Sequence, residues 1–254
     1  MTAVGFLGTG HIAAPMARAL ARDGHSVTVS RRNETVSTAL AGAGLGIAVA
    51  DNQGVVDAAQ VVFLCLRPAV WREALAALRF RADQQIVSVM AGVALADIAA
   101  QVRPARDISA TIPYGFIEHG GCPLPVAGDP GALAHLFGAR NPILPQPDEG
   151  ALRHHFAAST LVTAVLAVLE TGAAWLAEKT ADPASAEIYV ANLVAGVLAG
   201  LDRDRAGELA AERAALATEG TLSLQMHAGL AQGGALDLLA RTLESISARL
   251  GAGK

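Results

Sequence analysis

Short apolar runs alternate with helical patterns through the first 150 residues. The runs predict strands at Val4–Leu7, Ser26–Ser30, Gly46–Val49, Gln60–Leu66, Gln85–Met90 and Ile108–Ile112, and the spacing between them predicts helices at Ala13–Arg22, Asn52–Ala59, Ala69–Leu78 and Leu95–Val102. Strands that alternate with helices in this way are typical of a parallel sheet covered by helices on both faces. Two later runs, Pro123–Ala127 and Ile143–Pro145, contain prolines, so we expect edge strands there.

The pattern changes after Pro147–Gly150, where strand-like runs end. Helical patterns follow at Ala151–Glu178, Ala186–Gly200, Ala206–Ala217 and Leu236–Leu250. The first two are apolar nearly all round, and a helix of that kind must be buried by more than one neighbour. We therefore expect an α/β domain over residues 1–150 and an all-α domain over residues 151–254 that forms a homodimer through its helices.

A glycine-rich turn follows the first predicted strand. Gly8-Thr9-Gly10-His11-Ile12-Ala13 has glycines at the two positions that a dinucleotide turn requires, and Ala13 is small enough at the third. The turn opens a helix whose N-terminus would face the pyrophosphate. In this context the motif predicts a Rossmann-type domain with Gly8, Thr9, Gly10, His11 and Ile12 at the cofactor.

The end of the second strand indicates which dinucleotide binds. NAD sites usually carry Asp or Glu at this place for the ribose hydroxyls, whereas this chain reads Ser30-Arg31-Arg32-Asn33. Guanidinium groups bind a 2′-phosphate by charge-assisted hydrogen bonds. We interpret these four residues as cofactor contacts and expect NADP(H); a solvated basic turn is the alternative interpretation.

Other strand ends should complete the site, because ligands of open parallel sheets bind beyond the carboxyl ends of the strands. This rule places Leu66-Arg67-Pro68 and Met90-Ala91-Gly92 at the cofactor. It also places Tyr114 nearby, after Ile112-Pro113. A phenol there is a candidate catalytic proton donor, with packing over the cofactor or against a partner subunit as the alternative.

Composition agrees with a protein that binds small molecules. The chain has 254 residues and a net charge of −4, which gives no general electrostatic attraction to nucleic acid or an anionic membrane. Cys65 and Cys122 lie far apart without metal-ligand spacing, so we expect no metal. We recognise no secretory segment and no apolar stretch of transmembrane length, and we expect a cytoplasmic protein.

The chain resembles the pyrroline-5-carboxylate reductase family. The likeness is clearest in Gly5–Ala13, Phe63–Pro68 and Ser88–Val93. In that family an N-terminal Rossmann domain binds NADP and a C-terminal helical domain forms the dimer. The resemblance implies that Arg67 keeps the basic charge of the family's Val-Lys-Pro segment, and that Met90-Ala91-Gly92 lies by the nicotinamide.

Two segments depart from the family pattern. Ile112-Pro113-Tyr114 stands where relatives carry Met-Pro-Asn, and Ala217–Leu222 stands where they carry a Ser-Pro-Gly-Gly-Thr-Thr run that binds the substrate carboxylate. Glu219 is a poor neighbour for a carboxylate. The residues that would keep part of a substrate site are Ser159, Thr218, Gly220, Thr221 and Gln225.

These observations favour an NADPH-dependent reductase that transfers hydride to a small imine (C=N) substrate in a cleft at the dimer interface. One alternative is a carbonyl or β-hydroxyacid dehydrogenase. Such an enzyme should carry a catalytic lysine on a long helix between its domains, and the nearest candidate here is Lys179, at the end of its helix, which argues against this alternative. A deazaflavin-dependent NADP oxidoreductase is another. A catalytically inactive NADP-binding regulatory protein is the third, because the substrate motif is altered.

Overall fold

The computed structural model describes residues 1–252, which form two compact units. The first contains Met1–Phe156 together with the end of the chain from Ser247 on, and the second contains Ala157–Ile246. We call them the α/β unit and the helical unit. The return of the last helix to the α/β unit was not indicated by the sequence pattern.

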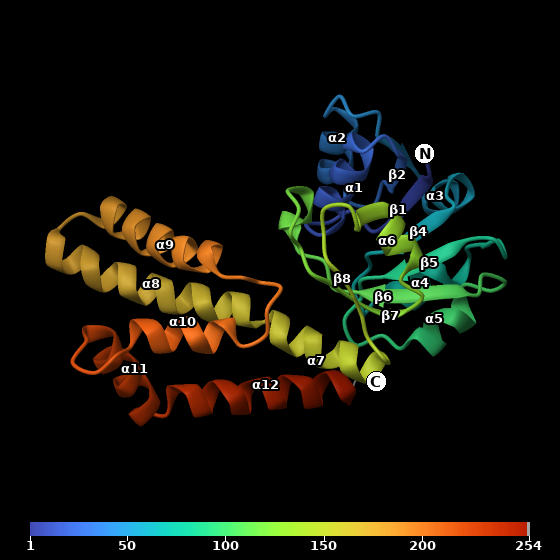
Figure 1. Cartoon of the computed structure of the whole chain (residues 1–254). Helices are drawn as coiled ribbons and strands as arrows, with labels where there is room; N and C mark the ends of the chain where they lie inside the picture. Colours follow the sequence, from blue (N-terminus) through green and yellow to red (C-terminus); the bar gives the residue numbers. More distant parts are fainter. Residues whose placement is uncertain (253–254) are drawn as a thin grey trace. The chain divides into compact units, whose positions relative to one another are not determined.

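A mixed sheet of eight strands forms the centre of the α/β unit (Figure 1). The spatial order is β3-β2-β1-β4-β5-β6-β7-β8, and every neighbouring pair is parallel except β6 and β7. The strands are β1 Ala3–Leu7, β2 Ser26–Ser30, β3 Ala48–Ala50, β4 Val61–Leu64, β5 Gln85–Ser88, β6 Asp107–Thr111, β7 Leu124–Gly128 and β8 Ile143–Pro145. The predicted Rossmann-type α/β class is confirmed.

One strand prediction was wrong in position. β7 is not an edge strand, because it pairs with β6 on one side and with β8 on the other. Pro125 is accommodated within it opposite Leu144 of β8, and β8 is the strand at the edge. The proline signal therefore marked a strand near the edge of the sheet rather than at it.

Helices flank the strands of this unit. They are α1 Ala13–Arg22, α2 Glu34–Ala41, α3 Asn52–Ala58, α4 Trp71–Ala76, α5 Leu95–Gln101, the 3-10 helix η1 Gly115–Glu118, α6 Gly131–Phe137 and the larger part of α7 Glu149–Ser159, whose last three residues belong to the helical unit. No pattern in the sequence predicted α2, α6 or η1. α2 begins where the side chain of Asn33 accepts a hydrogen bond from Val36 N–H at 3.4 Å, an N-cap directly after the two arginines.

The central strands are buried on both faces. Phe6 of β1 stacks on Phe63 of β4 with ring centroids 5.0 Å apart, and both pack with α1 residues such as Met16. Leu7, the next residue of β1, points to the other face of the sheet and belongs to a second cluster there with Val55 of α3. Burial on both faces explains why β4 is a continuous apolar run. It also holds β1 and α1 rigidly around the glycine turn.

The helical unit contains α8 Leu161–Thr180, α9 Pro183–Gly200, α10 Glu208–Leu216, α11 Leu222–Gln232 and most of α12 Ala235–Gly251. α8 and α9 lie side by side as a helical hairpin (Figure 1). α8 ends at Ala181, which has a left-handed φ of 56°, and Asp182 then caps α9 ahead of Pro183. The helix expected at 151–178 divides at Thr160 into α7 and α8, and α11 was not anticipated.

Apolar side chains are widely exposed on this unit. Trp175 of α8, Ile188 of α9 and Leu222 of α11 are 61%, 64% and 83% exposed. The stretch Glu149–Thr180 and α9 are long and apolar enough to cross a membrane when judged by length and composition alone. The expectation that no stretch reaches transmembrane length is thus wrong on that criterion. The observation is weak evidence for a membrane protein, because buried core helices of soluble proteins meet the same criterion.

Candidate functional site

The glycine turn has the geometry of a dinucleotide site. Gly8 follows β1 with φ 93°, and a Cβ atom there would collide with the backbone carbonyl oxygen of Cys65. Gly10 has no atom within 4 Å of the place that a Cβ would occupy, so its backbone is open to a ligand. α1 begins at Ala13 without a side-chain cap. Uncapped N–H groups at a helix N-terminus favour an anion.

Two hydroxyl groups fix the shape of this turn. Ser30, at the end of β2, is 0% exposed, and its Oγ accepts a hydrogen bond from Gly8 N–H at 2.9 Å. Thr9 donates its hydroxyl to the carbonyl oxygen of Ser30 at 2.5 Å. The side chain of Ser30 therefore faces the turn rather than the pocket. Ser30 would therefore affect a bound ligand by holding the backbone of the glycine turn in place.

A hollow of about 440 Å³ lies beside the turn. Its lining comes from three strand ends: Gly8, Thr9, Gly10, Arg32, Asn33, Glu34, Cys65, Leu66, Arg67 and Val70. Among the ion pairs of residues 1–252, none involves Arg31, Arg32 or Arg67. Guanidinium groups without carboxylate partners leave the rim of this hollow cationic, with Glu34 as its one acidic lining residue.

Cys65 is the thiol in this lining. Burial raises its pKa to about 12. A thiol with a pKa this high is neutral at physiological pH. Within residues 1–252 no three His, Cys, Asp or Glu side chains gather as a metal site.

The other predicted cofactor residues lie around the same end of the sheet, although not all line this hollow. Exposed His11 and partly buried Ile12 follow the turn, and exposed Arg31 and Pro68 follow β2 and β4. Met90 and Gly92, beyond β5, line a separate hollow of about 210 Å³ with residues of α5, α7 and α12, including Asp97, Glu149, Arg153 and Leu250. No motif in the sequence indicated that Glu149 and Arg153 contribute to a pocket.

Tyr114 leads from the β6 end into η1. Its backbone N–H donates to Cys122 Sγ at 3.4 Å, and its ring stacks on Phe116 with centroids 6.0 Å apart. The half-buried ring also packs against the apolar cluster beneath α1. A Cβ atom on the next residue, Gly115, would lie 3.8 Å from Pro15 Cγ, so this segment runs next to the first turn of α1.

The predicted substrate residues belong to the helical unit. Thr221 caps α11: its hydroxyl donates to the carbonyl oxygen of Thr218 at 2.7 Å and accepts from Leu224 N–H at 3.2 Å. Gly220 has φ 80°, which makes the tight turn before the helix possible. Gln225 is exposed one turn later, and Ser159 is the last residue of α7. Thr218, Gly220 and Thr221 thus form one local structure.

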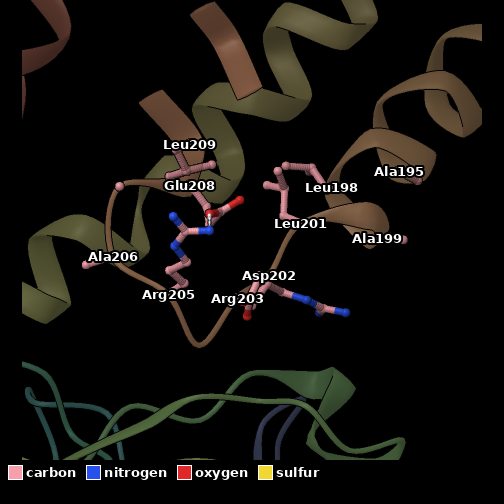
Figure 2. A pocket seen from close by; sticks show the side chains of 11 residues that line it. Ala195, Leu198, Ala199, Leu201, Asp202, Arg203, Arg205, Ala206, Glu208 and Leu209 are labelled. Atoms are coloured by element: carbon pink, nitrogen blue, oxygen red, sulfur yellow. Dashed lines mark ion pairs between the residues drawn. The ribbon is translucent and has the colours of Figure 1, made fainter. Parts of the chain in front are cut away.

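The helical unit also has an open hollow of about 670 Å³ at the loop between α9 and α10 (Figure 2). Its walls are mostly small or apolar residues such as Leu198 and Leu201. The Arg205–Glu208 ion pair, 3.2 Å long, crosses the loop. Because this ion pair joins residues three apart and its arginine is largely exposed, it contributes little to the stability of the unit.

Comparisons with known proteins agree with this architecture. Residues 3–92 match the family model described as "NADP oxidoreductase coenzyme F420-dependent". No curated protein matches the chain.

Solved structures match over nearly the full length. Pyrroline carboxylate reductase from Plasmodium falciparum, with NADP bound, has 10% identity and a TM-score of 0.84, and the match covers 99% of this chain and 97% of that one. 1-Pyrroline-5-carboxylate reductase from Streptococcus pyogenes has 18% identity, a TM-score of 0.80 and 98% coverage of both chains. An imine reductase from Pseudomonas sp. has 19% identity and a TM-score of 0.64, covering 98% and 91%.

At these identities a structural match establishes the fold. The resemblance to pyrroline-5-carboxylate reductases is confirmed at that level: the chain has their fold over nearly its whole length, and the family model for NADP oxidoreductases dependent on coenzyme F420 matches residues 3–92.

Proposed function

We propose that the protein is an NADPH-dependent oxidoreductase that transfers hydride to a small imine substrate. The observation that carries this proposal is the hollow at the glycine turn, where open backbone at Gly10 meets a rim with the cations Arg32 and Arg67. The relatives in fold include reductases whose descriptions name NADP, pyrroline carboxylate and imines.

The residues present fit NADP(H). The N-terminus of α1 and the backbone of Gly8–Gly10 would hold the pyrophosphate, and Arg31 and Arg32 would bind the 2′-phosphate. Ser30 supports this selectivity indirectly: its hydroxyl occupies the interior place where an NAD site would present a carboxylate, which would repel a phosphate. His11, Ile12, Asn33, Leu66, Arg67, Pro68, Met90, Ala91 and Gly92 remain the other proposed contacts.

The chemistry divides between the cofactor and the chain. NADPH, when bound, supplies the hydride. In this proposal the phenol of Tyr114 holds a proton near the acceptor, and a protonated imine needs little further acid assistance. The turn at Thr218, Gly220 and Thr221, with Gln225 and Ser159, would orient the polar groups of the substrate. Glu219 within that turn disfavours a carboxylate and favours a substrate without one, or a cationic amine.

We also propose that the enzyme is a cytoplasmic homodimer. The support is the exposed apolar surface of α8, α9 and α11, which the described chain leaves uncovered. A surface of this kind is typical of a helix face that packs on another copy of the same chain. The substrate cleft would then be completed at the dimer interface.

Cofactor titration tests the first half of the proposal. We expect NADPH to quench protein fluorescence with a dissociation constant at least tenfold lower than that of NADH. Arg32→Ala should reduce this preference about tenfold, corresponding to roughly 1.4 kcal/mol. Arg106→Ala removes an exposed arginine outside the pocket and is the matched control. Equal binding of NADH and NADPH would contradict the cofactor assignment.

A substrate panel tests the second half. NADPH oxidation is followed with cyclic imines, 2-keto acids and a deazaflavin. Turnover on an imine supports the proposal, whereas turnover on a keto acid would indicate a dehydrogenase. NADPH binding without turnover on any of them would favour a regulatory protein.

The deazaflavin is tested separately as the hydride acceptor, because the matched family model names coenzyme F420. In that alternative the acceptor is a planar deazaflavin, which takes hydride from NADPH at the same end of the sheet. Oxidation of NADPH with the deazaflavin as the sole acceptor would identify this function.

A further inference from the structure

An ionic cluster with a shielded carboxylate and two partly exposed arginines joins two segments of the α/β unit that are about 100 residues apart in the chain. The carboxylate of Glu118, at the end of η1, is 8% exposed. Arg18 donates to it through Nε at 2.9 and 3.0 Å and through Nη2 at 2.5 Å, and Arg22 donates through Nη1 at 2.6 Å. Bidentate pairing with a well-shielded carboxylate is a strong and directional form of ion pair.

The two arginines lie on one stripe of α1. Pro15, Arg18 and Arg22 are separated by three and four residues, the spacing that places side chains above one another on a helix face. Pro15 lies next to the start of η1, because a Cβ atom on Gly115 would be 3.8 Å from its Cγ, and the arginines hold the end of η1 at Glu118. η1 is therefore attached to α1 at both ends. α1 is also the helix that begins at the glycine turn.

Tyr114 is the residue immediately before this attached segment. Ile117 N–H donates to the carbonyl oxygen of Tyr114 at 3.0 Å, and the Tyr114 N–H donates to Cys122 Sγ. Cys122 is fixed in turn by its N–H bond to Asn141 Oδ1 at 2.9 Å. A shift of η1 along α1 would therefore move Tyr114 relative to the turn at Gly8–Gly10.

We propose that Glu118 is a positioning residue: its pairing with Arg18 and Arg22 sets the place of Tyr114 relative to the proposed cofactor site. This inference deepens the proposed function and rests on it for the link to catalysis.

The electrostatics agree with a permanent attachment. The hydrogen bond from Arg18 is the main cause that lowers the pKa of Glu118 from 4.5 to about 2, and the same bond raises the pKa of Arg18. The cluster is thus fully ionised over the pH range in which a reductase is assayed. Its contribution should not titrate in a pH–rate profile.

The test begins with the position of Tyr114 and not with activity. The full-length protein is labelled with 3-fluorotyrosine, and the ¹⁹F signal of Tyr114 is assigned with Tyr189→Phe, which removes the only other tyrosine. In the protein without cofactor, we expect Glu118→Gln to shift or broaden this signal. Arg72→Ala, which breaks the exposed Arg72–Asp97 pair between α4 and α5, is the matched control and should leave it unchanged.

The kinetic arm uses the substrate on which turnover is found. Glu118→Gln should lower kcat about tenfold while the dissociation constant of NADPH changes less than twofold, and the pH profile should keep its shape. Combined with Tyr114→Phe it should add no further loss, because both changes act through one phenol. Losses that multiply instead would overturn the positioning role.

The outcomes separate this inference from the proposed function. An unchanged Tyr114 signal in folded Glu118→Gln overturns the inference, whatever the activity. A shifted signal in a protein that neither binds NADPH nor turns over supports the attachment and refutes the function. If Glu118→Gln does not fold, Arg22→Ala removes only the more exposed pair and is expected to give the same changes at smaller size.

Discussion

In the α/β unit, Phe6 and Phe63 stack under α1 and are fully buried, whereas in the helical unit Trp175 and Val168 of α8 are more than half exposed. Both units are built from apolar helices or strands, so composition does not cause the difference. The sheet buries its two faces within one chain, and the helical hairpin has no such cover among the described residues. We infer that the first unit is complete by itself and that the second needs a partner.

The largest expected effect concerns the tight packing of the α/β unit. Gly8→Ala should destabilise the protein by about 3 kcal/mol or more, because its Cβ meets the Cys65 carbonyl and its φ is positive. NADPH binding should be lost as well. In the helical unit, Gly196→Ala has open space and a helical backbone, so it should stabilise by up to about 1 kcal/mol. Urea unfolding measures both, and equal effects would contradict the comparison.

The ionic cluster gives the next effect. Because the pKa of Glu118 is depressed in the folded state, its stabilisation is present above pH 4.5 and is lost as pH falls toward 2. Because solvent screens the partly exposed arginines, we expect an effect on the order of 1–2 kcal/mol, and Glu118→Gln should remove most of this pH dependence. The exposed Arg205–Glu208 pair of the helical unit should contribute under 1 kcal/mol, which Glu208→Gln can check by the same acid titration.

A charge on the exposed hairpin tests whether that unit has a partner. Val168→Glu should weaken a dimer at least 30-fold, or about 2 kcal/mol, with little change in the fold of each chain. Ala43→Glu adds the same charge to the exposed surface of the α/β unit and should have no effect. Sedimentation equilibrium measures association. A wild-type chain that is monomeric at every concentration would refute the inferred interface.

The smallest expected effect is a pH dependence of stability caused by His25, which lies before β2 at the opposite end of the sheet from the glycine turn. Burial, followed by the nearby His135 and the N-terminal amine, lowers the pKa of His25 despite the opposing charge of Asp23. The folded state then binds fewer protons than the unfolded state, so stability falls slightly as pH decreases below about 6.5. His25→Gln should reduce this slope in thermal unfolding between pH 7.5 and 5.5, and an unchanged slope in this variant would contradict the assignment.

Local patterns predicted most of the α/β unit because its signals are local. The turn at Gly8–Gly10 requires particular backbone angles, and β4 is a continuous apolar run, so the strand, turn and helix α1 followed directly. α2, α6 and η1 were not predicted, because they are short segments without a strong helical period. The position of β7 escaped because a proline signal cannot show which strand lies beyond it.

The candidate site was predicted in part for the same reason. The residues at the strand ends followed from the rule for parallel sheets, and Arg32 and Arg67 do line one hollow. The inward direction of Ser30 could not be predicted, because it depends on the bond with Gly8 across two strands. Nor could the pairing of Glu118 with α1, since ions so far apart in the chain carry no joint sequence signal.

The sequence by itself determined the glycine turn, the alternation of strands and helices, and the absence of a carboxylate at the end of the second strand, because each depends on near neighbours. Only the tertiary structure decided the order of the strands, the interior role of Ser30, the attachment of η1 to α1 and the exposure of the helical hairpin. Those features arise from contacts between distant segments, and their free energy depends on which groups the fold brings together and which it leaves in water.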